Sequence, residues 1–186
     1  MGHADDTASR RALLLIDFQY DFLADDGRMP VDRSQVQPVV TAARSAIDKA
    51  HDAGDLIVRI GNEFKPGDFV GNAFRRRAAI AGSAGAGWDP RVEAGDSVYL
   101  AKWRSNAFCN PELSHLMSDH LIERVCLTGL FARACVTATA KGARARGLQV
   151  DLLVDAIACK SDASRSAALN RLGRRGMQLV VGDPAD

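Results

Sequence analysis

The chain has 186 residues, 47% hydrophobic and 25% charged, which is enough to bury a full core and indicates one domain rather than two. Its 24 lysines and arginines nearly balance 23 acidic residues, which excludes a net charge that would recruit nucleic acid or an anionic membrane. The first ten residues lack the apolar core of a secretion signal, and no apolar run approaches the ~20 residues that span a bilayer, so we expect a cytoplasmic protein.

The first half of the chain predicts one strand-helix-strand unit followed by a long loop region. Residues 12–17 and 55–60 have strand patterns, and residues 32–53 between them have the periodicity of a helix that ends at Gly54. Residues 61–96 lose this pattern and contain many glycines together with Pro66 and Pro90, with a short helix predicted near residues 73–80. Long loops in compact domains commonly carry function, so we expect this region to shape a substrate pocket.

The second half alternates strands and helices regularly. Strands are predicted at residues 97–101, 124–128, 149–154 and 177–181, and helices at residues 111–121, 132–146 and 161–174. Such alternation implies right-handed crossovers and a mostly parallel sheet of about six strands covered on both faces. The predicted fold class is α/β, a single three-layer α/β/α domain over residues 11–181, with flexible tails at residues 1–10 and 182–186.

Three chemically useful side chains follow predicted strands. Asp17 ends the first strand, Lys102 follows the strand at residues 97–101, and Cys135 lies just beyond the strand at residues 124–128. The carboxyl ends of parallel strands form the crevice where ligands bind, so an acid, a cation and a thiol are expected to share one pocket. A cation there would keep Asp17 ionised or stabilise a developing negative charge.

Each of these residues also has a plainer interpretation. Cys135 lies at a predicted helix start, where the dipole and unpaired N–H groups favour a thiolate, but a free cysteine is often only a packing residue. Asp17 could cap a helix or bind loop amides, and Lys102 could be a surface lysine. Asp21 is a second candidate carboxylate, in a more easily solvated place. The other cysteines are assigned to packing: Cys109, Cys126 and Cys159.

Several other classes of function lack their sequence signals. The chain has no Cys-x-x-Cys pair, no histidine spaced for zinc and no glycine-rich phosphate-binding motif, so we expect no metal and no cofactor. The triplet Arg75, Arg76 and Arg77 is assigned to a solvated face rather than to an RNA site. A redox role for Cys135 stays open, because it would need a resolving cysteine whose distance the sequence does not show.

Three sequence blocks resemble the isochorismatase-like cysteine hydrolases, a family that includes nicotinamidases, N-carbamoylsarcosine amidases, ureidoacrylate amidases and metal-free isochorismatases. The blocks are residues 12–22 (ALLLIDFQYDF), 102–108 (KWRSNAF) and 128–140 (TGLFARACVTATA). Their order and separation match the family over about residues 11–181. The resemblance implies the isochorismatase-like hydrolase fold and a homo-oligomer.

The resemblance also implies roles for residues. Cys135 would be the nucleophile, Asp17 the general base and later acid, and Lys102 their electrostatic partner. Family members have a cis peptide before the residue four positions ahead of the cysteine, which here is the Leu130-Phe131 bond. This bond would aim the N–H groups of Phe131 and Cys135 at one oxyanion. The implied reaction is hydrolysis of a small amide-type C–N bond through a thioester intermediate.

Departures from the family pattern narrow the choice of substrate. Nicotinamidases carry an Asp-x-His metal motif after the second strand, whereas residues 59–65 read RIGNEFK and no histidine lies between His51 and His115. True isochorismatases lack the nucleophilic cysteine, so Cys135 argues against a vinyl-ether hydrolase. Asn106 stands where a small serine is frequent, which alters the expected pocket shape.

The substrate itself stays open at the level of sequence. Predicted pocket walls are Trp103, Asn62, Glu63 and Phe131, each with packing or loop solvation as the alternative. The expected partner is a small molecule, with no nucleic acid and no membrane. The scissile bond could be an amide, carbamoyl, ureido or ester bond. Two alternatives remain: a non-catalytic small-molecule-binding relative, and a metal-free isochorismatase-type hydrolase acting on a non-amide substrate.

Overall fold

A six-stranded parallel sheet forms the centre of the molecule. The computed structural model describes residues 10–182, so the predicted tails lie almost entirely outside the described residues. The strand order is β3-β2-β1-β4-β5-β6, and every adjacent pair is parallel. The strands are β1 (Arg11–Ile16), β2 (Leu56–Asn62), β3 (Val98–Lys102), β4 (Arg124–Leu130), β5 (Gln149–Ala158) and β6 (Gln178–Val180). The predicted α/β class with a six-stranded sheet is confirmed.

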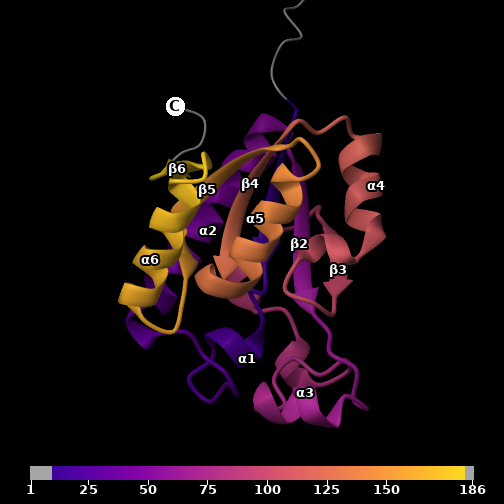
Figure 1. The fold of residues 1–186 in the computed structure, drawn as a ribbon, viewed down its shortest axis with the longest axis vertical. Coiled ribbons are helices and arrows are strands. Elements are labelled where there is room, and N and C mark those ends of the chain that lie inside the picture. Colours follow the sequence, from indigo (N-terminus) through magenta and orange to yellow (C-terminus); the bar gives the residue numbers. More distant parts are fainter. Residues whose placement is uncertain (1–9, 183–186) are drawn as a thin grey trace, which may run out of the picture.

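Helices cover both faces of this sheet (Figure 1). The long helix α2 (Arg33–Ala53) lies behind the sheet in this view, while α4 (Pro111–Asp119), α5 (Thr137–Arg144) and α6 (Asp162–Gly173) lie in front. Right-handed crossovers explain the division, because the chain steps one way from β1 to β2 and β3, and the opposite way in the connections that lead to β4, β5 and β6. Within residues 10–182, we find no helix with both the length and the apolarity needed to cross a bilayer.

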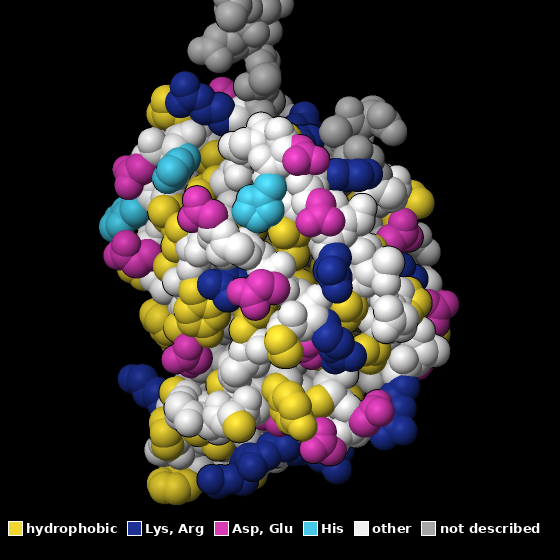
Figure 2. Space-filling view, turned by 180° about the vertical axis from the view of Figure 1, so that it is seen from behind, with side chains coloured by type: hydrophobic (Ala, Val, Ile, Leu, Met, Phe, Trp, Pro, Cys, Tyr) yellow, Lys and Arg dark blue, Asp and Glu magenta, His cyan; other side chains and the backbone are white. Residues whose placement is uncertain are grey.

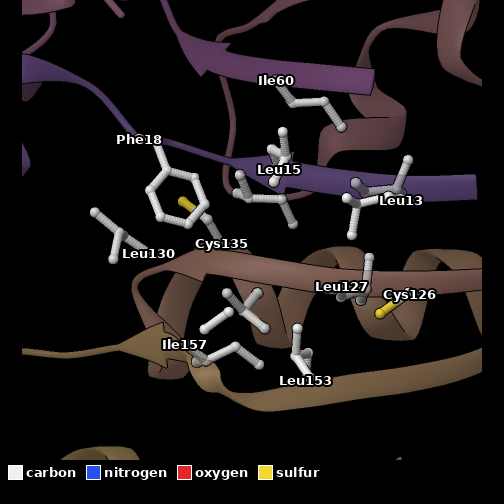
Figure 3. Close-up of a cluster of buried hydrophobic side chains, with 14 of the residues drawn as sticks. Leu13, Leu15, Phe18, Ile60, Cys126, Leu127, Leu130, Cys135, Leu153 and Ile157 are labelled. Carbon is white, nitrogen blue, oxygen red and sulfur yellow. The ribbon is translucent and has the colours of Figure 1, made fainter. Parts of the chain in front are cut away.

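The core is built on β1, the third strand of the six in spatial order. From Ala12 to Ile16 every side chain is buried, because helices cover both faces of a parallel sheet and apolar residues are needed on both. Figure 3 shows part of this core, with Leu13 and Leu15 of β1 beside Leu127 of β4 and Ile157 of β5. This rigid centre holds the carboxyl ends of the strands in register.

The loop region differs from its prediction in the position of its helix. The helix expected near residues 73–80 is instead α3 (Phe69–Phe74), because the Asp68 carboxylate accepts from the Gly71 N–H and caps an earlier start. Positive φ angles at Arg76, Arg77 and Ala79 prevent its continuation. The region also holds short 3-10 helices at Ala84–Ala86 and Pro90–Val92.

The end of the molecule that carries α3 is partly apolar. Figure 1 places α3 beyond the carboxyl ends of the strands, near the short helix α1 (Tyr20–Leu23), which the sequence did not predict. Phe69, Val70 and Phe74 are exposed on α3. Figure 2 shows hydrophobic and basic side chains together at this end, while charges of both signs are interspersed over the rest of that face.

Two other elements differ in detail from the sequence pattern. The helix predicted over residues 132–146 begins as a π-helical turn (Ala132–Val136) before α5, and the Thr137 hydroxyl donates to the Ala132 carbonyl at 2.6 Å. Strand β5 continues to Ala158, and its pairing with β4 shifts register between Leu127 and Gly129. Both irregularities lie near the carboxyl end of β4, where Cys135 follows.

Replacing Gly129 with alanine is expected to destabilise the fold by more than about 3 kcal/mol. Its φ is 115°, and an added Cβ would lie 2.0 Å from the Ile16 carbonyl oxygen, which is backbone and cannot move aside. Gly54 is the matched control: it has a φ of 70° at the end of α2, as predicted, but a Cβ there meets nothing within 4 Å. Gly54→Ala should cost only about 1 kcal/mol. Urea unfolding checks both, and equal costs would contradict the close approach at Gly129.

Candidate active site

Lys102 is the centre of a buried polar cluster at the carboxyl ends of the strands. It is the last residue of β3, pairs in register with Asn62 of β2, and is completely buried, so it is not a surface lysine. Its Nζ lies 3.0 Å from Asp17 Oδ2, 3.2 Å from Cys135 Sγ and 2.6 Å from Asn62 Oδ1. The ammonium therefore donates hydrogen bonds to Cys135 and Asn62 and forms an ion pair with Asp17.

Asp17 reaches the cluster because β1 ends one residue before it. Its N–H donates to the Ile60 carbonyl at 2.7 Å, which extends the pairing with β2, and its φ of 60° turns the chain out of the strand. The carboxylate is completely buried and forms an ion pair with Lys102. Burying an unpaired carboxylate is costly, so this partner is what makes the position tolerable.

Cys135 comes from the π-helical turn that follows β4. Its side chain is 7% exposed, and its sulfur accepts from Lys102 Nζ and, at 3.8 Å, from Asn62 Nδ2. The Leu130-Phe131 peptide bond directly after β4 is cis, as the sequence resemblance implied. The structure thus brings the acid, the cation and the thiol from three separate strand ends into one cluster.

Burial controls the protonation of the cluster. Burial raises the pKa of the Asp17 carboxyl above its ordinary value, and the Lys102 charge only partly offsets this. For Lys102, burial lowers the pKa, but the charges of Asp17 and Cys135 outweigh it and leave the pKa raised. Burial and the Asp17 charge raise the pKa of Cys135 to about 12, against the opposing effect of Lys102. Burial therefore opposes the thiolate that the helix start was expected to favour.

The predicted pocket walls divide into residues near the cluster and residues apart from it. Asn62 is 4% exposed and contacts both Lys102 and Cys135. It is therefore part of the polar cluster itself and not only a wall of the pocket. Glu63 follows it but directs its carboxylate to the Tyr99 hydroxyl at 2.9 Å, so the structure does not bring Glu63 into the cluster. Trp103 is 46% exposed after β3.

Phe131 lies next to the cis bond and is buried. Its ring meets that of Phe22 edge to face, with the centroids 5.4 Å apart. This packing fixes the backbone just ahead of the π-helical turn. Its roles as an oxyanion donor and pocket wall stay predictions.

Two polar residues near the cluster were missed or misjudged from the sequence. Gln19 is completely buried and binds the backbone of Asn62, although nothing in the sequence analysis singled it out. Its only signal was a polar residue between two aromatic ones directly after a buried strand. Asp21 was expected to be easily solvated, but it is buried and its carboxylate accepts from the N–H groups of Ala79 and Arg28. It ties the loop region to α1.

Of the other cysteines, Cys126 and Cys159 lie in the hydrophobic core, and Cys109 does not. Cys126 and Cys159 are buried, Cys109 is half-buried, and all are free thiols. Figure 3 shows Cys126 at the opposite end of the hydrophobic cluster from Cys135, so Cys126 is not placed to resolve an oxidised Cys135. Over residues 10–182, no group of three His, Cys, Asp or Glu side chains is placed to hold a metal ion.

Comparison with known protein families gives one match that spans nearly the whole chain. The model of the isochorismatase domain matches residues 11–182. A streptothricin hydrolase from Streptomyces noursei is 29% identical over 150 residues, which cover 78% of this chain and 53% of that protein. The ureidoacrylate amidohydrolase RutB of Enterobacter sp. (strain 638) is 29% identical over 153 residues, covering 69% of this chain and 66% of that protein. The chain therefore spans about half to two thirds of these relatives.

Solved structures agree on the architecture. An isochorismatase-like hydrolase from Alkaliphilus metalliredigens superposes with a TM-score of 0.86 at 23% identity, covering 94% of this chain and 96% of that one. A pyrazinamidase/nicotinamidase from Streptococcus mutans UA159 superposes with a TM-score of 0.83 at 27% identity, covering 91% of this chain and 99% of that one. The sheet and its covering helices are thus shared over almost the full length of both structures.

Proposed function

Because this chain belongs to the isochorismatase family, whose domain model spans residues 11–182, we propose that it is a cysteine-dependent hydrolase of a small amide-type C–N bond. Cys135 is the nucleophile, Asp17 the general base and acid, and Lys102 their electrostatic partner. The observation that carries the proposal is the position of Lys102 Nζ, 3.0 Å from Asp17 Oδ2 and 3.2 Å from Cys135 Sγ in a buried cluster.

The first half of the reaction forms a thioester. Asp17 removes the proton from Cys135 Sγ, and the resulting thiolate attacks the carbonyl carbon and forms the C–S bond. A thiol with a pKa of about 12 requires such a base, and Lys102 beside the sulfur stabilises the charge as it develops. The N–H groups of Phe131 and Cys135 bind the tetrahedral oxyanion. The C–N bond then breaks, and Asp17 returns its proton to the leaving nitrogen.

The second half restores the enzyme. Asp17, ionised again, takes a proton from water, and the hydroxide attacks the thioester carbonyl at the same oxyanion site. The C–S bond breaks, the acid product leaves, and the proton held by Asp17 returns to the sulfur. The cycle consumes one water and regenerates the thiol, so it needs no cofactor.

The names of the relatives agree on the kind of bond but not on the molecule. One is an amidohydrolase of ureidoacrylate, and one solved neighbour is a pyrazinamidase/nicotinamidase. The side chain beside the cluster at the end of β2 is the amide of Asn62, and residues 59–65 contain no histidine. We therefore favour a small amide, carbamoyl or ureido substrate over nicotinamide. The expected homo-oligomer and cytoplasmic location are part of the same proposal.

A substrate screen tests the function. Wild-type protein and Cys135→Ala are incubated side by side with small primary amides, N-carbamoyl amino acids and ureido acids, and ammonia is measured. We expect ammonia release from at least one class by the wild type only. Rapid quenching followed by mass spectrometry should then show the acyl group of that substrate on Cys135. Equal ammonia from both proteins would favour a non-catalytic binding relative.

A further inference from the structure

Gln19 uses its whole amide group on backbone partners beside the cluster. Its Oε1 accepts from the Asn62 N–H at 2.8 Å, while its Nε2 donates to the Asn62 carbonyl at 2.9 Å and to the Ala86 carbonyl at 2.7 Å. The side chain is completely buried. Both backbone groups of one residue, Asn62, are therefore held by a single side chain from another strand end.

The close approach of Gln19 to β2 depends on the residue before Asn62. A Cβ at Gly61 would lie 3.1 Å from Gln19 Nε2 and 2.6 Å from the Tyr99 hydroxyl, so any side chain there would displace one of the two. The absence of a side chain at Gly61 therefore leaves room for the Gln19 amide beside β2. This arrangement fixes Asn62 more firmly than strand pairing alone, because β2 ends at that residue.

Asn62 in turn holds Lys102 and contacts Cys135. Its Oδ1 accepts from Lys102 Nζ at 2.6 Å, which is the shortest contact of the ammonium, and its Nδ2 lies 3.8 Å from Cys135 Sγ. While Asn62 holds the ammonium, Lys102 Nζ also donates to Cys135 Sγ and forms an ion pair with Asp17. A rotated or displaced Asn62 would free the ammonium to turn away from the sulfur.

We propose that Gln19 is a positioning residue of the active site, which fixes Asn62 so that Lys102 stays directed at Asp17 and Cys135. The side-chain hydrogen bonds of Gln19 go to the backbone of Asn62 and Ala86 and not to the sulfur, so Gln19 acts on the cluster through Asn62. A role for Gln19 in catalysis rests on the proposed function. The effect of Gln19 on the reactivity of Cys135 does not, because that reactivity is measured without any substrate.

Alkylation of Cys135 by iodoacetamide tests the proposal. The rate is followed from pH 6 to 10 by mass spectrometry of the peptide containing Cys135, so the other cysteines do not interfere. Gln19→Met keeps the length of the side chain and removes every hydrogen bond to Asn62. We expect its alkylation rate to fall about tenfold at every pH in this range, because a less well-directed Lys102 stabilises the thiolate less.

Gln35 provides the matched control. Its Oε1 also accepts from a backbone N–H, that of Cys159 at 3.0 Å, but it makes no contact with the cluster. Gln35→Met removes this hydrogen bond and should lower thermal stability, while its Cys135 alkylation stays within about twofold of wild type. A purely structural Gln19 would behave in the same way. Alkylation of Gln19→Met within about twofold of the wild-type rate, or faster, would overturn the proposal.

A second variant keeps the test decisive if Gln19→Met does not fold. Gln19→Glu retains the acceptor for the Asn62 N–H and can donate only when the carboxyl is protonated. The ratio of wild-type to variant alkylation rates should therefore increase as the pH rises, and a constant ratio of one would reject the role of Gln19. These outcomes are separate from the proposed hydrolysis, which fails if Cys135→Ala retains turnover.

Discussion

Cys135→Ala is expected to reduce hydrolysis of any substrate found in the screen by at least about 10⁴-fold, because no other group can form the thioester. The fold should persist, since the change removes one sulfur from a side chain that is 7% exposed and leaves the strand pairing intact. The measurement is the rate of ammonia release at saturating substrate, with circular dichroism to confirm folding.

Cys135→Ser separates nucleophilicity from shape. A hydroxyl fits the same space and can still accept from Lys102, but it is far harder to ionise than a thiol, so we expect a loss close to that of alanine. A serine variant with nearly full activity would indicate that Asp17 activates water directly. That result would remove the thioester from the mechanism while leaving the site in place.

Lys102→Met is expected to lower both stability and activity. It leaves the Asp17 carboxylate buried without its counter-charge, which costs about 3–5 kcal/mol in comparable buried pairs. The pKa of Asp17, already raised by burial, should rise further without Lys102, so less of the base is ionised at pH 7. Loss of the cation beside the sulfur should reduce turnover by a further factor of about 10² to 10³.

The raised pKa of Asp17 also predicts how the stability of Lys102→Met changes with pH. A carboxyl whose pKa is higher in the folded than in the unfolded protein contributes stability below its unfolded pKa and loses it as the pH rises through its folded pKa. The free energy of unfolding of Lys102→Met should therefore fall from pH 5 to pH 8 more steeply than that of wild type. Urea titrations at both pH values measure the difference.

The double variant Asp17→Asn with Lys102→Met is the control for this pair. It removes both charges and should recover much of the lost stability while staying inactive. Its unfolding should also lose the extra pH dependence, since the titrating carboxyl is gone. If the double variant is no more stable than Lys102→Met, the cost lies in packing and not in an uncompensated carboxylate.

Much of the fold could be predicted because most strands are continuous apolar stretches in the sequence. The run before Asp17 is buried on both faces, so it reads as a parallel strand without ambiguity, and its end places the carboxyl. The same logic placed Lys102 and Cys135 at strand ends of a common edge. The resemblance of three sequence blocks added their roles and the cis bond between Leu130 and Phe131.

The parts that could not be predicted depend on contacts between distant segments. The position of α3 follows from the capping carboxylate of Asp68 and from positive φ angles after it, which no periodicity encodes. Gln19 acts on a backbone 43 residues away, so its role exists only in the folded chain. The raised pKa of Cys135 reflects burial and the Asp17 charge, both of which arise only in the folded chain.

The insertion of β4 beside β1 has a consequence for synthesis of the chain. One edge of β1 pairs with β2 early in the sequence, whereas its other edge pairs with β4 at Arg124–Leu130. During synthesis, more than a hundred residues are therefore added while one edge of the apolar strand β1 has no partner. An unpaired apolar strand edge favours aggregation. Cys135 follows β4 in the sequence, so chains released before that strand is made carry Asp17 and Lys102 without the thiol that lies beside them in the folded protein.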